Sequence, residues 1–309
     1  MPMRVAVLMG GVSSEREVSL RSGHAIAKAL SLRDCDVLSV DMKSENLAQH
    51  LGGAALDAVF IALHGRFGED GKVQSQCEAL GLPYTGSRPE ASALALDKVL
   101  AKKVFVRNGI KTPSFAVVRD AGANNLRQFQ KTLDLPLVVK PPLEGSSIGL
   151  SIVREESQLA SAVQIALGYG PEVLLESFIA GKELTVGVLG DRALPVVQIV
   201  PRSGVYDYHS KYTPGQTEYA VPAPLDAKIA SRVQKVALEA FHALQCEDFG
   251  RVDIILSPDG EAFVLEVNTI PGFTETSLLP KAARAAGIGF EDLCKEILAM
   301  GVKKAQVLR

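Results

Sequence analysis

Two short apolar segments near the C-terminus, residues 252–256 and 262–267, constrain the fold of this chain more than any other feature. The residues Ser-Pro-Asp-Gly at 257–260 separate them. Apolar segments on both sides of such a turn predict a β-hairpin. One face of this hairpin is predicted to pack on the core, so the side chains on its other face decide what it can bind.

The hairpin carries four polar residues, Arg251, Asp253, Glu266 and Asn268. A four-residue loop would place Arg251 opposite Glu266 and Asp253 opposite Val264. Side chains alternate between faces along a strand, and residues directly opposite each other share a face. We therefore expect all four polar side chains to point to the same side of the sheet.

Two carboxylates and an amide oxygen are the hard ligands that Mg²⁺ takes, usually completing its shell with water and substrate phosphate. We therefore interpret Asp253, Glu266 and Asn268 as a metal site. A solvated sheet face with a cross-strand ion pair is the alternative. The metal site is favoured because the core face is already supplied by other residues, namely Val252, Ile254, Leu265 and Val267.

A glycine- and serine-rich loop, Glu-Gly-Ser-Ser-Ile-Gly at 144–149, follows an apolar strand pattern that ends in Lys140. Backbone amides in such a loop can converge on phosphate oxygens, and the lysine adds a positive charge. It is not a Walker A motif, whose lysine follows the glycines. An ordinary hairpin turn is the alternative, but a metal face elsewhere in the chain favours nucleotide phosphates.

The composition excludes several classes of function. A hydrophobic content of 47%, 22% charged residues and a net charge of −2 indicate a globular protein and argue against broad binding to nucleic acid or acidic membranes. The four cysteines form no Cys-x-x-Cys pair, and no segment resembles a signal peptide or a membrane span. The dinucleotide fingerprint is absent, which argues against NAD or FAD. We expect a cytoplasmic protein.

The fold class is predicted to be α/β, changing to α+β in the central and C-terminal parts. Apolar runs at 4–9, 36–40 and 58–63 alternate with helical patterns, which indicates an open parallel sheet in a domain spanning residues 1–96. Ser14 and Glu17 predict a capping box at the start of its first helix.

A central domain is expected at 97–187, where Asp97 is predicted to cap a helix at 98–108 and apolar runs at 115–118 and 137–140 are predicted to be strands. A C-terminal domain is expected at 188–309. Residues 174–185 read as a hairpin that could hold a purine, although taken alone an ordinary hairpin is favoured. Residues 201–224 lack periodicity over a length that compact domains rarely tolerate, and the three tyrosines Tyr206, Tyr208 and Tyr212 argue against disorder. We interpret this segment as a lid.

Six separated motifs in this order resemble the ATP-grasp carboxylate–amine ligases, and within them the D-alanine–D-alanine ligase family. They are Gly-Gly-Val-Ser-Ser-Glu-Arg-Glu-Val-Ser-Leu at 10–20, Leu-His-Gly-Arg-Phe-Gly-Glu-Asp-Gly at 63–71, the loop at 144–149, Tyr-Asp-Tyr-His-Ser-Lys-Tyr at 206–212, Gly-Arg-Val-Asp at 250–253, and the stretch 266–278. In the last motif Phe273 and Thr276 stand where the family more often has methionine and histidine. The resemblance covers nearly the whole chain and implies a three-domain ATP-grasp architecture.

The resemblance also implies roles for individual residues. Asp253, Glu266 and Asn268 would hold two Mg²⁺ ions, with Mn²⁺ as a substitute, against the phosphates of ATP. The phosphates would also contact Lys98, Lys140 and Ser147. Adenosine would be bound by Glu176, Phe178, Ile179 and Glu183.

For the amino acid substrates, the resemblance implies that Glu15 binds the ammonium group of the first D-alanine, supported by Ser146 and Tyr212, with His64 near its carboxylate. Arg251 and the Gly272 amide would stabilise the oxyanion. The second D-alanine would contact Lys211, Tyr212, Ser277 and Leu278. Taken singly, Glu15 also fits a helix-start charge, His64 a strand-end histidine and Lys98 a solvated helix residue.

The implied reaction is ATP-dependent ligation of two D-alanine molecules by a homodimeric enzyme, supplying peptidoglycan precursors, with no nucleic acid or membrane partner. A D-alanine–D-lactate ligase is the nearest alternative, disfavoured by Tyr212, which marks the dipeptide enzymes in the family. A nucleotide-binding module without turnover is disfavoured because Lys140 and every metal ligand are present. A NAD-dependent oxidoreductase is disfavoured by the missing glycine fingerprint.

Overall fold

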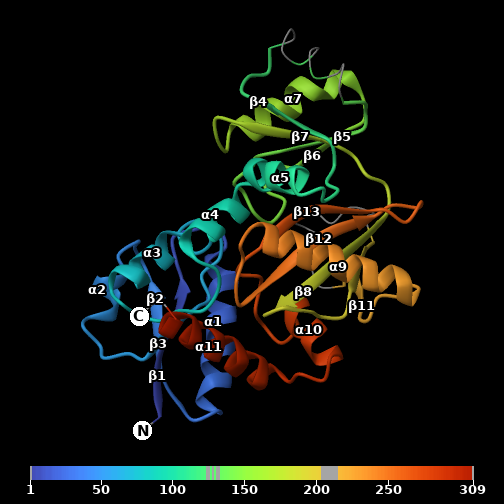
Figure 1. The fold of residues 1–309 in the computed structure, drawn as a ribbon. Coiled ribbons are helices and arrows are strands. Elements are labelled where there is room, and N and C mark those ends of the chain that lie inside the picture. The colour runs from blue at the N-terminus through green and yellow to red at the C-terminus, as the bar shows by residue number, and fades with distance from the viewer. Residues whose placement is uncertain (1, 123–125, 127–128, 130–132, 203–214, 308–309) are drawn as a thin grey trace.

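The computed structural model describes residues 2–122, 126, 129, 133–202 and 215–307, and it divides into three sheet-based units (Figure 1). The N-terminal unit has a parallel sheet in the order β2-β1-β3. Its strands are β1 (Met3–Gly10), β2 (Cys35–Met42) and β3 (Ala58–Ile61), and its helices are α1 (Arg16–Ser31), α2 (Leu47–Leu51), α3 (Lys72–Ala79) and α4 (Pro89–Leu96). Strands β1 and β3 are almost continuously apolar and buried, as parallel strands covered on both faces are. The predicted open parallel sheet is confirmed.

The central unit is an antiparallel sheet in the order β4-β7-β5-β6, with helix α7 (Glu156–Leu167) packed against it. Its strands are β4 (Phe115–Val118), β5 (Leu137–Lys140), β6 (Ser151–Val153) and β7 (Val173–Ser177). Helix α5 (Lys98–Arg107) leads into this unit, and the Asp97 carboxylate accepts hydrogen bonds from the Val99 and Leu100 amides at its start. The predicted cap of this helix at Asp97 is confirmed.

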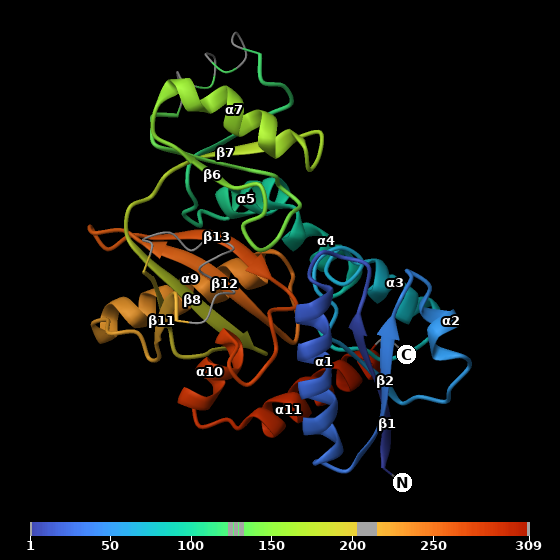
Figure 2. The same cartoon turned by 180° about the vertical axis from the view of Figure 1, so that it is seen from behind.

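The C-terminal unit is a six-stranded sheet in the order β11-β10-β8-β12-β13, with β9 paired to β8. Its strands are β8 (Lys182–Leu189), β9 (Arg192–Ala193), β10 (Val197–Pro201), β11 (Thr217–Ala220), β12 (Phe249–Leu256) and β13 (Ala262–Asn268). Helix α9 (Ala227–Ala243) covers one face of this sheet, as Figure 2 shows from behind, and the opposite face carries the polar side chains of β12 and β13.

Of the last two helices, α10 (Leu278–Ala285) packs on β8 of the C-terminal sheet, and α11 (Phe290–Val307) packs back against α1 and β3 of the N-terminal unit. An aromatic cluster lies at this junction, where the Phe273 ring centroid is 6.0 Å from that of Phe60, 5.8 Å from Phe249 and 5.6 Å from Phe290. These residues come from the N-terminal sheet, from the C-terminal sheet and the segment that follows it, and from helix α11. One apolar core therefore holds the C-terminal sheet against the N-terminal sheet.

Phe273, which replaces the family's usual methionine, is 1% exposed and belongs to this core. Phe273→Ala is expected to lower the free energy of unfolding by about 3–5 kcal/mol, because it removes a fully buried ring and leaves a cavity. Urea denaturation measures the change, with Phe263→Ala on a half-buried strand position as the matched control. A loss no larger than that of the control would show that the ring is not packed as described.

The hairpin loop is longer than predicted. Leu256 pairs with Ala262, which leaves five residues in the loop and not four, and the Ser257 amide donates a hydrogen bond to the Glu261 carbonyl within it. This shift of one residue would by itself move the carboxylates of the two strands to opposite faces of the sheet.

A β-bulge in β13, opposite Asp253, restores the shared face. Asp253 pairs with Glu266, and Arg251 pairs with Asn268. The predicted pairs, Asp253 with Val264 and Arg251 with Glu266, are therefore wrong. All four polar residues nevertheless occupy half-buried positions on one face, as expected, while the alternate residues are buried on the other.

Two expected boundaries also differ from the structure. Strand β8 spans residue 187 and pairs over its length with β12, so the expected boundary at 187 cuts a strand. We propose that the boundary lies in the link between β7 and β8. The segment 201–224, expected to be a lid without regular structure, includes strand β11, which pairs with β10. Residues 203–214 of that segment lie outside the described part of the chain.

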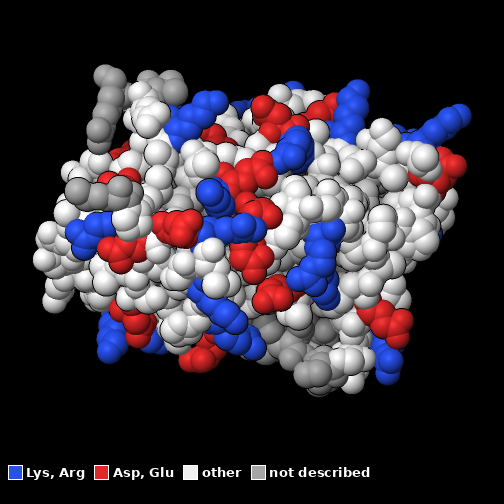
Figure 3. Space-filling view, turned by 90° about the horizontal axis from the view of Figure 1, so that it is seen from below, with Lys and Arg blue, Asp and Glu red and all other residues white. Residues whose placement is uncertain are grey.

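On the face shown in Figure 3, lysine and arginine side chains are interspersed with aspartate and glutamate. This agrees with the small net charge of −2. Among the described residues, no helix combines the length and the apolar character that crossing a membrane requires.

Candidate active site

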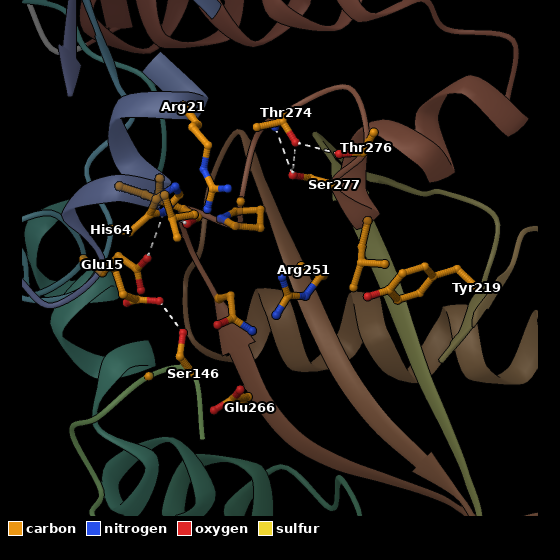
Figure 4. Close-up of a pocket in the computed structure, with 18 residues that line it drawn as sticks. Glu15, Arg21, His64, Ser146, Tyr219, Arg251, Glu266, Thr274, Thr276 and Ser277 are labelled. Atoms are coloured by element: carbon orange, nitrogen blue, oxygen red, sulfur yellow. Dashed lines mark hydrogen bonds and ion pairs between the residues drawn. The ribbon is translucent and has the colours of Figure 1, made fainter. Parts of the chain in front are cut away.

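A cavity of about 420 Å³ lies where the three units meet (Figure 4). The N-terminal unit contributes Glu15 and His64 from the carboxyl ends of its strands, where open α/β sheets bind ligands. The central unit contributes Ser146 from its loop. The C-terminal sheet contributes Arg251 and Glu266. The structure thus brings together side chains that are widely separated in the sequence.

Glu15 crosses from the N-terminal unit to the glycine- and serine-rich loop. The Ser146 hydroxyl donates a hydrogen bond of 2.5 Å to Glu15 Oε1 (Figure 4). A Cβ atom at Gly65 would lie 3.0 Å from Glu15 Oε2, and one at Gly145 would lie 3.1 Å from it. Glycine at both positions therefore lets two backbone segments approach this carboxylate closely.

The predicted capping box at Ser14 and Glu17 is wrong. Helix α1 starts at Arg16, and its N-cap is Glu15, whose side chain makes no capping bond. The Glu15 carboxylate is instead directed into the cavity, and the Ser13 hydroxyl accepts the hydrogen bond of the Glu15 amide. A helix start without a side-chain cap is one of the costs of placing this charge in the site.

His64 is 4% exposed and is held on both ring nitrogens. Its Nδ1 donates to the Ile270 carbonyl at 2.9 Å, and its Nε2 lies 3.1 Å from the Ser22 hydroxyl. Glu69 Oε1 lies 3.6 Å from Nδ1. Burial on its own lowers the pKa of His64, but the neighbouring Glu69 carboxylate outweighs this effect, so the pKa is raised above the ordinary value. Glu69 therefore stabilises the protonated form of His64.

Glu69→Gln is expected to lower the pKa of His64, because it removes the partner that raises this pKa and leaves the burial that lowers it. NMR titration of the imidazole measures the shift. Asp70→Asn, which changes the next residue but not a partner of His64, is the matched control. An unchanged His64 pKa in Glu69→Gln would show that another group keeps the ring protonated.

The polar face of the hairpin is an ordered network. Arg251 donates from Nε and Nη2 to the two oxygens of Asp253, both at 2.9 Å. Asn268 Nδ2 donates to Asp253 Oδ2 at 3.0 Å, and the Thr185 hydroxyl donates to Asp253 Oδ1 at 2.6 Å. A bidentate pair of this kind fixes the orientation of both the guanidinium and the carboxylate.

A second cavity of about 110 Å³ adjoins the first and shares Gly145, Ser146 and Glu266 with it. Lys98, which is 7% exposed, reaches this cavity from helix α5. Its Nζ donates to the Glu144 carbonyl at 2.8 Å and lies 3.1 Å from Glu266 Oε2. Burial on its own lowers the pKa of Lys98, but the charge of Glu266 outweighs this effect and raises the pKa, which keeps a cation here.

Lys140 lines this smaller cavity, together with Ser147, Glu183 and Asp253. Its ammonium lies 2.7 Å from Glu176 Oε2. Ser146 and Ser147 both have positive φ, at 51° and 60°, a conformation that turns successive backbone amides toward one side of a loop. The cavity therefore combines two lysines, a turned loop and the four carboxylates of Glu144, Glu183, Asp253 and Glu266.

Among the described residues, no group of three or more His, Cys, Asp or Glu side chains has metal-binding geometry. The predicted set contains only two such residues, Asp253 and Glu266, which are cross-strand neighbours, and takes its third oxygen from Asn268. Two carboxylates and an amide oxygen facing a cavity with phosphate-binding features fit Mg²⁺, which keeps water and phosphate ligands.

The residues expected to bind adenosine lie at the link between β7 and β8. Glu176 is 2% exposed and paired with lysines, so its carboxylate is already engaged. The Phe178 amide donates to the Pro136 carbonyl at 3.0 Å, and the Arg154 guanidinium lies 5.6 Å from the Phe178 ring centroid. Ile179 is half-buried beside it.

The residues expected to bind the second substrate lie at the start of helix α10. Gly272, Ser277 and Leu278 all line the larger cavity. The Ser277 hydroxyl accepts a hydrogen bond of 3.0 Å from the Thr274 amide. Thr276 lines the cavity as well, whereas Phe273 does not, because its ring is in the core. Lys211 and Tyr212 lie outside the described residues.

Several residues in or beside the site were given no role from the sequence, namely Arg21, Glu69, Lys102, Thr185 and Tyr219. Arg21 and Tyr219 line the larger cavity from helix α1 and strand β11 (Figure 4). Lys102 lies one helical turn after Lys98 on the same face of α5, a spacing of four residues that the sequence displays. Glu69 lies within the motif at 63–71. No sequence signal distinguishes the other three from ordinary helix and strand residues.

The comparisons with known proteins agree with this geometry. The family model of the D-ala D-ala ligase N-terminus matches residues 45–87, and that of the D-ala D-ala ligase C-terminus matches residues 104–299. A D-alanine–D-alanine ligase of Syntrophotalea carbinolica is 52% identical over 297 residues, covering 96% of this chain and 95% of that protein.

Two solved structures have the same fold. A crystal structure of D-alanine–D-alanine ligase from Bacillus anthracis has a TM-score of 0.89 at 35% identity, and its complex with ATP has a TM-score of 0.87 at 32% identity. Each covers 99% of this chain and 100% of the matched chain. The expected α/β fold in an ATP-grasp arrangement is confirmed. This chain belongs to the D-alanine–D-alanine ligase family.

Proposed function

We propose that this protein ligates two D-alanine molecules to D-alanyl-D-alanine at the expense of ATP, and that the product supplies peptidoglycan precursor synthesis. The observation that carries this proposal is the sharing of Gly145, Ser146 and Glu266 between the two cavities. An amino acid in the larger cavity and phosphates in the smaller one would meet at these three residues. Such adjacency is what phosphoryl transfer to a bound carboxylate requires.

In the first step, the carboxylate of the first D-alanine attacks the γ-phosphorus of ATP, and ADP leaves with the electrons of the broken P–O bond. Glu15 binds the ammonium group of this substrate, and His64 as imidazolium attracts its carboxylate. Lys98 and Lys140 neutralise phosphate oxygens, and Ser147 with the loop amides covers them. Electrostatic stabilisation of this kind supplies most of the catalysis in phosphoryl transfer.

In the second step, the neutral amine of the second D-alanine attacks the acyl carbon of the acyl phosphate. The resulting oxyanion is stabilised by Arg251 and the Gly272 amide, and phosphate leaves as the amide forms. Ser277, the Leu278 amide and Lys211 bind the second carboxylate. Tyr212, with the segment that links β10 and β11, closes over the site and excludes water, which would hydrolyse the acyl phosphate.

Asp253, Glu266 and Asn268 would hold two Mg²⁺ ions, with Mn²⁺ as a substitute, and these would supply charge neutralisation between the phosphates of ATP. Glu176, Phe178, Ile179 and Glu183 would bind adenosine. We also propose that the enzyme is a homodimer and acts in the cytoplasm, where ATP is available. Light scattering of the purified protein tests the oligomeric state.

The experiment that tests the activity is phosphate release from ATP with D-alanine, with L-alanine, and with D-alanine plus D-lactate. We expect release with D-alanine alone and D-alanyl-D-alanine as the product by mass spectrometry. Formation of D-alanyl-D-lactate as the main product would favour the ester-forming alternative. ATP binding without phosphate release under any of these conditions would favour the module without turnover.

A further inference from the structure

Lys102 is a buried charge that the proposed reaction does not use. Its side chain is 0% exposed, although lysine is almost never fully buried unless paired. Its Nζ lies 2.6 Å from Glu176 Oε1 and donates to the Thr112 hydroxyl at 2.5 Å. The Thr112 hydroxyl donates in turn to the Val264 carbonyl at 2.7 Å. Lys102 is therefore held in place from both the central sheet and strand β13.

Glu176 forms ion pairs with two lysines, one at each of its carboxylate oxygens. Lys102 lies at Oε1 and Lys140 lies 2.7 Å from Oε2. The two lysines differ in their access to the smaller cavity. The Lys140 side chain is 11% exposed and lines this cavity, whereas the Lys102 side chain is fully buried and does not line it. One buried carboxylate needs only one cation for neutrality, so the cluster contains one positive charge in excess.

We propose that Lys102 is a positioning residue of the nucleotide site, which acts as the permanent countercharge of Glu176 and so lets Lys140 move from Glu176 to the phosphates of a bound nucleotide.

The physical reason is the cost of an unpaired buried charge. Were Lys140 the sole partner of Glu176, its transfer to a phosphate would leave a buried carboxylate without a cation, which is strongly unfavourable. With Lys102 in place, Glu176 remains paired throughout. Burial lowers the pKa of Lys102 to about 8, opposed by the charge of Glu176, so the ammonium form still predominates at neutral pH.

The inference rests on the proposed function, because it needs a nucleotide in the smaller cavity. Its test is the dissociation constant of ADP with Mg²⁺, measured by calorimetry in the absence of D-alanine. Lys102→Met is expected to weaken ADP binding about tenfold or more, since Lys140 is then retained by Glu176 and one charge-assisted contact to phosphate is lost. The matched control is Lys103→Met, at the exposed neighbouring residue on α5, which should bind ADP like the parent.

A Glu176→Gln background separates this role from a merely structural one. Without the carboxylate, Lys140 needs no replacement partner to leave, so adding Lys102→Met to Glu176→Gln should not weaken ADP binding further. A further loss in the double variant would overturn the proposal, because the effect of Lys102 would then not pass through Glu176. If Lys102→Met alone does not fold, the comparison between Glu176→Gln and the double variant decides the question.

The outcomes also distinguish this inference from the proposed function. If the parent protein binds ADP and Lys102→Met binds it equally well, the inference is wrong while the nucleotide site stands. If the parent binds no ADP, both are wrong. The Michaelis constant for D-alanine should change less than about twofold in Lys102→Met, because Lys102 does not line the amino acid cavity.

Discussion

Asp253→Asn and Glu266→Gln are each expected to lower kcat for dipeptide formation by about a thousandfold. Each variant keeps the shape of the side chain but removes a carboxylate charge from the polar face of the hairpin, where Glu266 lines both cavities and Asp253 lines the smaller one. Charge stabilisation of a transferring phosphoryl group is worth orders of magnitude in rate, and these two carboxylates are the only ones on the polar face of the hairpin as described.

The measurement is steady-state phosphate release at saturating ATP, D-alanine and Mg²⁺, with unfolding curves to verify the fold. The matched control is Glu261→Gln, which makes the same chemical change in the loop of the same hairpin, where Glu261 pairs with Lys111 at 2.7 Å on the surface. The control should turn over like the parent. Near-normal turnover by either Asp253→Asn or Glu266→Gln at high Mg²⁺ would reject the metal assignment.

Asp253 has a second role that its variant should reveal. It holds the Arg251 guanidinium through two hydrogen bonds, so Asp253→Asn also loosens the group proposed to stabilise the oxyanion. Glu266→Gln leaves this pair in place. We therefore expect Glu266→Gln to impair the partial reaction that forms acyl phosphate, and Asp253→Asn to impair both this reaction and amide formation.

Glu15→Gln is expected to raise the Michaelis constant for the first D-alanine by about ten- to a hundredfold while changing that for ATP by less than about twofold. The neutral amide loses the charge-assisted bond to the substrate ammonium. Glu15 lines only the larger of the two cavities, which is why the nucleotide should be unaffected. Initial rates over a matrix of both substrate concentrations separate the two constants.

The matched control is Glu17→Gln, an exposed carboxylate in the first turn of the same helix. It tests whether a negative charge near the start of α1 is enough, since such charges stabilise helix N-termini. If Glu15→Gln affects both Michaelis constants equally, or if Glu17→Gln has the same effect, Glu15 acts through the helix and not through the substrate.

Many elements could be predicted from local sequence because their residues are buried in a simple pattern. The strands at 115–118 and 137–140 have the predicted bounds, and helix α5 begins at its predicted cap. The loop of the hairpin and its bulge could not be predicted, because both depend on how β12 and β13 settle against β8 and α9. The prediction of a shared polar face was right, although the pairing on which it was based was wrong.

The lysines of helix α5 show the same limit at the site. Lys98 could be assigned through the resemblance to the family, whereas Lys102 reads as an ordinary helix residue, and only the position of Glu176 on β7 makes it a buried countercharge. Phe273 shows the reverse case. It departs from the family pattern within a motif of the site, yet its burial among other phenylalanines gives it a place in the core.

The sequence by itself determined the family, the order of the elements and the kinds of group available to the site, because these depend on local patterns and on motifs that are contiguous in the chain. Tertiary structure alone decided which groups meet. Glu15 and Ser146 are 131 residues apart in the chain, yet their side chains are hydrogen-bonded. Such contacts follow from the packing of whole sheets and helices against one another, and that packing is a property of the folded core which no single segment encodes.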